Sequence, residues 1–198
     1  ARTTRVPVLD FADFELRKPI GRGATASVYR AYYRGYPVAC KDLATNMINE
    51  ITYDSVHRFC REALLFIHIQ HINIIKFFGV CLRPPSLYLV FELATHGTLR
   101  NLLDSSARKR KRALRRTTPK GRQNHRQSIN QNKNSPLSWQ DKLWIALDIA
   151  TGMQVLHHKD IIHRDLNTAN VLVTFMKEEG RLVAKICDFG LARKLRKN

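Results

Sequence analysis

Residues 161–172 read IIHRDLNTANVL, and this polar loop between two apolar runs decides how the rest of the chain is interpreted. Apolar runs on both sides of a short loop can hold a few polar side chains rigidly at the mouth of a cleft. The Asp165 carboxylate could accept a proton from an attacking hydroxyl group, and the side-chain oxygen of Asn170 could bind a cation such as magnesium. For an isolated motif, the alternative is a turn whose Asp and Asn bond only backbone groups. The other motifs of the chain decide between the two.

The chain has the size and composition of a globular domain. Its 198 residues are 44% hydrophobic and 9% aromatic, which is enough to bury a core. No apolar run approaches the roughly 18 residues that a membrane-spanning helix needs. The cysteines lie far apart and form no C-x-x-C pair, so neither a zinc site nor a disulfide framework is indicated. Reduced cysteines favour a cytoplasmic location.

The net charge of +18 is concentrated in one segment. Residues 105–136 contain eleven Lys and Arg, no acid and few apolar residues, which predicts a disordered surface insertion. Its densest part, RKRKRALRR from Arg108 to Arg116, could bind nucleic acid, an import receptor or anionic lipid, and an import receptor would imply a nuclear location. The alternative is a solvated charged loop.

A glycine turn precedes a lysine near the N-terminus. Residues 11–18 alternate between apolar and polar side chains and predict a strand that leads into residues 20–28, IGRGATASV. Gly21 and Gly23 permit a tight turn and a close approach to phosphate oxygens, although a plain hairpin would show the same pattern. Lys41 ends the next apolar run, where it could reach phosphates as a point charge.

Two amphipathic helices are expected. Apolar residues recur at helical spacing between Ser55 and His71, and Glu62 lies next to that stripe. An acid there is costly without a cationic partner, and Lys41 is the candidate. The second helix follows Ser138, with Asp141 in capping-box position. Its apolar face comprises Trp139, Leu143, Ala146, Leu147, Ala150 and Met153.

Strands are expected at residues 74–80 and 87–91, and a hairpin at 171–173 and 182–187 that ends in Asp188-Phe189-Gly190. Taken together, these motifs resemble those of eukaryotic protein kinases, over nearly the whole chain except the insertion. In this resemblance residues 20–28 form the glycine-rich loop, Lys41 and Glu62 form the ion pair, and residues 163–165 form the catalytic loop.

The resemblance implies an α+β, two-lobed fold over residues 11–198. An antiparallel sheet with one helix would form an N-lobe at residues 11–92, and a mainly helical C-lobe would begin at residue 97. The chain starts with Ala1 and stops eight residues after Gly190. We therefore expect an incomplete catalytic domain, with the apolar face of the 139–158 helix exposed and activity of the chain alone uncertain.

The same resemblance implies Mg²⁺-dependent transfer of the ATP γ-phosphate to a hydroxyl of a protein substrate, as in signal transduction. Asp165 would be the base, supported by Lys41 and Glu62, while Asn170 and Asp188 would bind Mg²⁺. ATP would contact Ile20, Gly21, Gly23, Val28, Ala39, Lys41, Glu92, Ala94 and Leu172.

Within the family, the chain is most similar to the tyrosine-kinase-like group, which includes the Roco and leucine-rich-repeat kinases. Serine/threonine kinases usually carry Lys two residues after the catalytic Asp, where this chain has Asn167, and Ala169-Asn170 partly fits tyrosine kinases. Serine and threonine are expected ahead of tyrosine as acceptors. Two alternatives are a nucleotide-binding pseudokinase that acts as a scaffold, and a nucleic-acid-binding protein that acts through its basic insertion.

Overall fold

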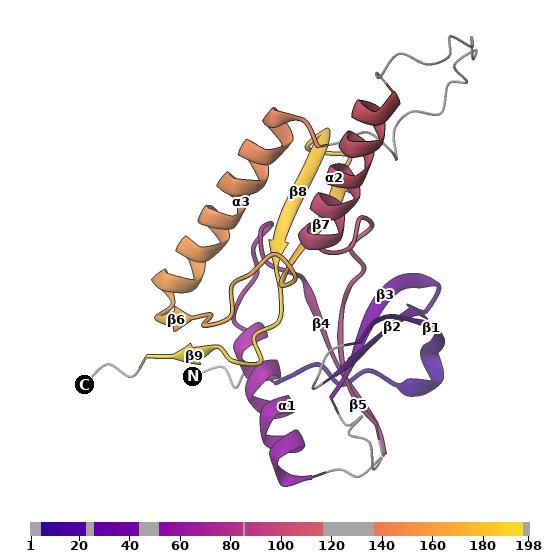
Figure 1. Ribbon diagram of the computed structural model, residues 1–198. Coiled ribbons are helices and arrows are strands. Elements are labelled where there is room, and N and C mark those ends of the chain that lie inside the picture. The colour runs from indigo at the N-terminus through magenta and orange to yellow at the C-terminus, as the bar shows by residue number, and fades with distance from the viewer. Residues whose placement is uncertain (1–4, 23–25, 44–51, 85, 117–136, 196–198) are drawn as a thin grey trace.

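The computed structural model describes residues 5–22, 26–43, 52–84, 86–116 and 137–195. These residues form two halves (Figure 1). A five-stranded antiparallel sheet in the order β1-β2-β3-β5-β4 lies with helix α1 in one half. Helices α2 and α3 and a hairpin between them form the other half. This is the α+β arrangement expected from the sequence, with a sheet and one helix in the N-terminal half and part of a mainly helical C-terminal half.

The sheet is built from short strands, of which β5 in the interior is the most continuously buried and β1 at the edge is mostly exposed. Its strands are β1 Phe14–Arg22, β2 Ser27–Tyr33, β3 Tyr36–Asp42, β4 Phe77–Arg83 and β5 Ser86–Glu92, and a single turn of 3-10 helix, Phe11–Asp13, precedes β1. Arg34 and Gly35 have φ angles of 49° and 81°, which is the left-handed geometry of a two-residue hairpin turn between β2 and β3. The sheet therefore brings the glycine turn and the lysine strand side by side.

Helix α1, Tyr53–Phe66, covers the sheet and carries the predicted glutamate. Thr52 caps it, and the Thr52 and Ser55 side chains form a capping box with each other's backbone N–H groups. Its buried face includes Phe59, Glu62 and Phe66. The helix ends at Phe66, before the predicted His71, because the chain turns there toward β4.

The C-terminal half holds α2 Leu99–Arg116, α3 Trp139–His158 and the predicted hairpin, β7 Val171–Met176 with β8 Arg181–Ile186. The strands β6 Ile161–Ile162 and β9 Arg193–Lys194 pair with each other. Helix α3 packs closely on β8. A Cβ atom added to Gly152 would lie 2.8 Å from the Asn73 carbonyl oxygen and 2.9 Å from Ile186 Cδ1, so glycine is required at this crossing.

The basic insertion differs from its prediction in its first third. Helix α2 continues to Arg116, so the structure has a helix at residues 105–116, where the sequence predicts a disordered insertion. Good helix formers such as Arg, Lys, Ala and Leu fill this stretch, which the reading of charge alone overlooked. Residues 117–136 of the same prediction lie outside the described residues. The Leu137 backbone N–H donates to Ser106 Oγ over 3.3 Å, so the chain returns to the point that it left.

Helix α3 buries a different face from the one that the sequence marks as apolar. Its buried residues are Ile145, Asp148, Gly152 and Leu156. Trp139, Leu143 and Leu147 are 72%, 57% and 55% exposed, as expected for the opposite face. In the described part of the chain, no helix is long and apolar enough to cross a membrane.

Candidate active site

The register of the sheet gathers the predicted nucleotide contacts of the first three strands. Gly21 lies opposite Val28, and Val28 lies opposite Lys41. Residues directly opposite on neighbouring strands point to the same face, and Ala39, two residues before Lys41, shares that face. Ile20, the neighbour of Gly21, is 48% exposed. Gly23 lies outside the described residues.

The segment that follows β5 closes the other side of this site. The Val173 N–H donates to the Gly97 carbonyl over 2.8 Å, and Thr98 bridges to Leu172. Leu172 therefore lies beside the segment that contains Ala94. Glu92 uses its carboxylate to pair with Lys185 Nζ at 2.9 Å and its N–H to bond the Lys76 carbonyl at 3.0 Å.

Three charged side chains meet in the space between the sheet, α1 and the segment after β8. Lys41 Nζ contacts Glu62 Oε1 at 2.8 Å and Oε2 at 3.0 Å, and Asp188 Oδ1 at 2.8 Å. The Glu62 side chain is 2% exposed, whereas that of Asp188 is 43% exposed. The buried Glu62 therefore holds Lys41 from the side of the core, and the partly exposed Asp188 holds it from the side of the site.

The charges in this cluster shift one another's protonation. Burial would lower the pKa of Lys41, but Glu62 and Asp188 outweigh burial and raise that pKa, which keeps the ammonium group charged. Burial raises the pKa of Glu62, with Lys41 opposing the shift. Burial acts in the same direction on Asp188, yet the charge and hydrogen bond of Lys41 outweigh it and hold the Asp188 pKa below its ordinary value. Asp188 is thus ready to bind a cation.

Aromatic packing fixes the direction of Asp188. The ring of Phe189 is fully buried and stacks on Phe66 of α1, with centroids 4.3 Å apart and planes 3° apart. The His163 ring meets Phe189 edge-on at 5.4 Å. Asp188 itself has a φ of 63°, an uncommon conformation for a residue other than glycine. With Phe189 held inside the core, Asp188 turns toward Lys41.

The catalytic-loop candidates form their own network. Asn170 Nδ2 donates to Asp165 Oδ2 at 2.8 Å, and Asn167 Nδ2 donates to Asp165 Oδ1 at 3.1 Å. This network is tied to the Asp188 segment because the Cys187 N–H donates to the Asn170 carbonyl at 3.0 Å. Asp165 thus has both oxygens oriented by amide groups, with Arg164 in a strained left-handed conformation beside it, at a φ of 68°.

The residues present fit a magnesium ion. Mg²⁺ prefers oxygen ligands such as carboxylates and amide oxygens. Asn170 uses its amide nitrogen on Asp165, which leaves the amide oxygen as the atom that can face a cation. Asp188 is ionised and partly exposed. Among the residues that the structure describes, no three His, Cys, Asp or Glu side chains come together in a way that could hold a metal ion.

The sequence reasoning missed several positioning contacts. Arg61 Nη2 donates to the Gly190 carbonyl at 2.6 Å, and His163 Nε2 lies 3.0 Å from the Cys187 carbonyl. Phe66 falls within the apolar stripe predicted between Ser55 and His71, and in the structure it also supports Phe189. The sequence signal is their position, since Arg61 adjoins Glu62 and His163 lies two residues before Asp165. Their partners lie too far along the chain to be read from spacing.

Comparison with known proteins agrees with this geometry. The sequence profile of the family described as protein tyrosine and serine/threonine kinase matches residues 14–198. Serine/threonine-protein kinase CTR1 of Arabidopsis thaliana is 30% identical over 93% of this chain and 19% of its own length. The dual specificity testis-specific protein kinase 1 of Rattus norvegicus is 33% identical over 92% of this chain and 24% of its own length.

A third relative, mitogen-activated protein kinase kinase kinase 10 of Homo sapiens, is 36% identical over 96% of this chain and 17% of its own length. The chain belongs to the protein kinase family, and its similarity to CTR1 and to this human kinase supports the tyrosine-kinase-like group. It spans only about a quarter or less of the length of these relatives.

Proposed function

We propose that this chain supplies the nucleotide-binding and catalytic residues of a Mg²⁺-dependent protein kinase that phosphorylates serine and threonine ahead of tyrosine. The observation that carries the proposal is Lys41, held at 2.8 Å by both the buried Glu62 and the open Asp188. A pseudokinase without catalytic charges would not need this arrangement, and Asp165 completes the set. The names of the relatives, which include serine/threonine and dual specificity kinases, support the order of acceptors.

In this proposal the chain mainly positions and stabilises charge. Lys41 binds phosphate oxygens of ATP, and Glu62 keeps its ammonium group directed into the site. Magnesium, when bound by Asp188 and Asn170, would neutralise charge that develops on the phosphates. The acceptor hydroxyl oxygen forms a bond to the γ-phosphorus as the bond to the β-γ bridging oxygen breaks, and ADP leaves. The hydroxyl proton passes to an Asp165 carboxylate oxygen.

The adenine ring would lie between the sheet and β7, against Val28, Ala39 and Leu172. Phe91 lies behind this space, because it pairs with Ala39 across the sheet and is 8% exposed. Its ring also packs on Phe66 at 4.8 Å, so it belongs to the core as well. Phe91 should therefore limit the size of the base that the site accepts.

Binding of Mg-ATP tests the first half of the proposal. Mg-ATP should raise the melting temperature of the wild-type chain, and Lys41→Ala should reduce that rise because a phosphate contact is lost. Lys142→Ala removes an equal charge from the surface of α3 and should leave the rise unchanged. Each variant is compared with its own ligand-free melting temperature, since Lys41→Ala also leaves Glu62 unpaired. Wild-type protein that gains no stability from Mg-ATP would contradict the proposal.

Phosphate transfer tests the second half. Transfer of labelled γ-phosphate to a protein substrate should fall by about 100- to 10,000-fold in Asp165→Asn, because proton transfer from the acceptor is lost. Mg-ATP binding should persist in the same variant. Asp54→Asn changes an exposed acid on α1 and is the matched control. Activity that survives in Asp165→Asn would contradict the assigned base, and phosphoamino-acid analysis of the product identifies the acceptor.

The basic run Arg108–Arg116 should be separable from these activities. It forms the last turns of α2, beyond the bond that joins Ser106 to Leu137. Replacing residues 107–136 by a short flexible linker should therefore leave Mg-ATP affinity nearly unchanged. We further propose that this run directs the protein to a location in the cell or binds anionic partners. Loss of nucleotide affinity in the deletion variant would show instead that the run supports the cleft.

A further inference from the structure

An irregularity between β1 and β2 gathers three cations. Leu16 pairs with Ala31 and Pro19 with Tyr29, so Arg17 and Lys18 together lie opposite the single residue Arg30. Such a bulge re-aims side chains and is common near functional sites. In a regular antiparallel pair, Arg17 and Lys18 would point to opposite faces of the sheet. The bulge thus concentrates positive charge in one place.

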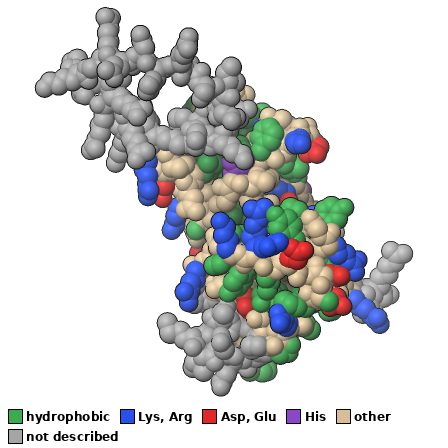
Figure 2. All heavy atoms as spheres, turned by 90° about the vertical axis from the view of Figure 1, so that its right-hand side faces the viewer, with side chains coloured by type: hydrophobic (Ala, Val, Ile, Leu, Met, Phe, Trp, Pro, Cys, Tyr) green, Lys and Arg blue, Asp and Glu red, His purple; other side chains and the backbone are tan. Residues whose placement is uncertain are grey.

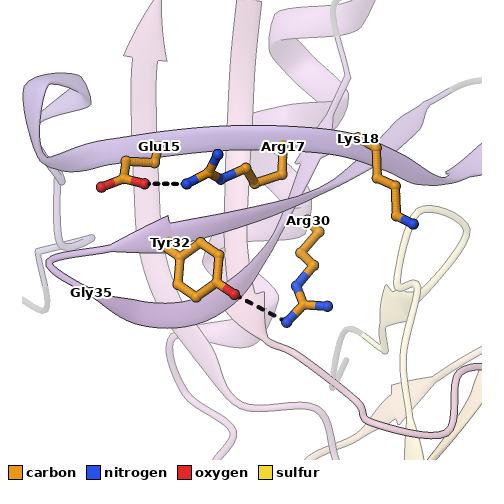
Figure 3. Close-up of a pocket in the computed structure, with 6 residues that line it drawn as sticks. All are labelled: Glu15, Arg17, Lys18, Arg30, Tyr32 and Gly35. Atoms are coloured by element: carbon orange, nitrogen blue, oxygen red, sulfur yellow. Dashed lines mark hydrogen bonds and ion pairs between the residues drawn. The ribbon is translucent and has the colours of Figure 1, made fainter.

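These cations line an open surface depression of about 530 Å³ (Figure 3). In that view, Lys18 and Arg30 extend to the same side of β1 and β2, with the Tyr32 ring next to Arg30. The full lining consists of Glu15, Arg17, Lys18, Arg30, Tyr32 and Gly35. Figure 2 faces the side of the molecule on which β1 lies, and shows Lys and Arg side chains gathered near the middle of this face.

Existing contacts leave this charge only partly compensated. Arg17 pairs with Glu15 at 2.7 Å, but both side chains are mostly exposed, at 58% and 67%, so the pair is weak and easily exchanged. Glu15 is the single acid in the lining, against three cations. Two positive charges therefore remain in excess.

Arg30 carries the more specific signal. Its Nη2 donates to the Tyr32 hydroxyl at 3.2 Å, and its guanidinium lies 5.6 Å from the centre of the Tyr32 ring. Its Nε is buried and has no hydrogen-bond partner in the described part of the chain. An unpaired buried donor costs about 1–3 kcal/mol in general, and a ligand oxygen could relieve this cost if the Arg30 side chain turns Nε toward the pocket.

We propose that this pocket, which we call the bulge pocket, binds a phosphomonoester group. A phosphomonoester carries about −1.5 to −2 charge at neutral pH, which matches the excess of two cations, and its three oxygens can accept from two guanidinium groups. A single carboxylate would leave one positive charge uncompensated. The Tyr32 hydroxyl provides a further donor, and the open pocket admits a phosphate carried on a peptide side chain.

The bulge pocket is separate from the proposed nucleotide contacts. Arg30 lies opposite Ala39, so it shares a face of the sheet with Lys41, but Lys41, Asp165 and Asp188 are not among the residues that line the pocket. The proposal therefore does not rest on kinase activity. It predicts a second anion site beside the cleft, at the end of the sheet where Gly35 turns the chain.

Fluorescence anisotropy with a labelled phosphoserine peptide that lacks basic residues tests the proposal. Binding is measured in about 150 mM salt, which screens general attraction to the basic chain. The double variant Arg17→Gln/Arg30→Gln should bind at least about tenfold more weakly, because charged hydrogen bonds to phosphate are lost. Arg83→Gln is the matched control, since it removes a cation on β4 that packs over Phe11 at 4.1 Å. It should change affinity by less than about twofold.

Folding of the variants is checked by circular dichroism and melting temperature. The single variant Arg17→Gln changes an exposed side chain, so it keeps the test informative if Arg30→Gln destabilises the sheet. Mg-ATP binding should be unchanged in both. Peptides with serine or glutamate in place of phosphoserine should bind more weakly than the phosphopeptide.

The source of the phosphate is distinguished by competition. Displacement by inorganic phosphate at concentrations similar to those of the peptide would assign the pocket to small phosphate compounds, whereas much weaker displacement would assign it to a phosphorylated protein segment. Three results would overturn the proposal. These are equal weakening by Arg83→Gln, equal binding of the serine peptide, and loss of Mg-ATP binding in the bulge-pocket variants.

Discussion

Helices α1 and α3 each bury a carboxylate that needs a cationic partner, but the two cations differ in their other contacts. Each begins with a capping box, and each buries one carboxylate against a cation from a strand. In α1, Glu62 pairs with Lys41 of β3 at 2.8 Å, and in α3, Asp148 pairs with Arg181 of β8 at 2.8 Å. The two carboxylates are almost equally buried, with side chains 2% and 5% exposed.

The difference lies in the remaining partners of each cation. Arg181 makes two bonds to Asp148 and one to the Leu182 carbonyl, and Asp148 also accepts from the Ala184 N–H at 2.9 Å. This group of bonds joins α3 to the β7–β8 hairpin. Lys41 instead bonds a second acid, Asp188, which is 43% exposed. Arg181 also reaches an exposed acid, Glu179 of the β7–β8 turn, but only at 3.8 Å. The segment of Asp188, in contrast, is bonded to the loop of Asp165 and Asn170 through the Cys187 N–H.

The comparison shows that a buried ion pair does not by itself indicate function. Burial and distance are nearly the same in the two cases. What separates them is the second acid of each cation, which is 3.8 Å away in a surface turn for Arg181 and 2.8 Å away, beside the catalytic-loop candidates, for Lys41. The following predictions test whether the Asp148 pair acts on folding and the Glu62 pair on ligand binding.

The largest effect is expected from Asp148→Ala. It removes two hydrogen bonds of Arg181 and leaves the Ala184 N–H without its acceptor, so the free energy of unfolding should fall by about 3–5 kcal/mol. Urea unfolding followed by circular dichroism measures this loss. Glu178→Ala, in the exposed β7–β8 turn, should change stability by no more than about 0.5 kcal/mol. A small loss in Asp148→Ala would show that this ion pair does not hold α3 on the β7–β8 hairpin.

An intermediate effect is expected from Glu62→Gln. The amide keeps the shape but not the charge, so Lys41 is held less firmly and Mg-ATP should bind about tenfold more weakly, a change of roughly 1.4 kcal/mol. Asp148→Asn is the matched change on α3 and should leave the affinity of the folded protein unaltered. Isothermal titration at a temperature where both variants are folded measures the two affinities. Equal weakening in both variants would remove the proposed distinction.

A smaller effect is expected from the two helix caps. Thr52→Ala and Ser138→Ala each leave one N-terminal N–H of a helix without its acceptor, and each should lower the free energy of unfolding by about 1 kcal/mol. Thr52→Ala should also weaken Mg-ATP binding slightly, because α1 carries Glu62. Ser138→Ala should not. Equal weakening of Mg-ATP binding by Ser138→Ala would contradict the proposal that only α1 affects ligand binding.

The smallest effect concerns the acid dependence of the open pair. Because Lys41 holds the pKa of Asp188 below its ordinary 3.8, the folded state binds fewer protons there than the unfolded state does in the acid range. The contribution of Asp188 is therefore present above about pH 4 and is lost as pH falls through the lowered pKa. Since Asp188 is partly exposed, the contribution is small.

Urea unfolding of wild type and Asp188→Asn between about pH 3 and 7 checks this, since the stability difference between them should narrow toward the acid end. A difference that widens as pH falls would mean that the Asp188 pKa is raised rather than lowered.

The positions of the charged residues were predictable because local patterns mark them. Lys41 ends an apolar strand, Glu62 adjoins a helical stripe, and Asp165 and Asn170 lie in a loop between apolar runs. The caps of α3 and the β7–β8 hairpin were also visible in this way. At residues 105–116 the structure has the end of α2 where charge density predicts disorder, and the high helix propensity of Arg, Lys, Ala and Leu favours this helix.

By itself, the sequence determined the kinase resemblance, the candidate site residues and the elements on which most of them lie. Only the tertiary structure decided that Lys41 joins Glu62, 21 residues away, to Asp188, 147 residues away. It also decided that Arg181 is the partner of Asp148, and that α3 packs through Ile145 and Leu156 instead of its larger apolar face. The physical reason is that periodicity reports which residues share a face of one element. Which faces meet depends on close packing and charge pairing between segments far apart in the chain.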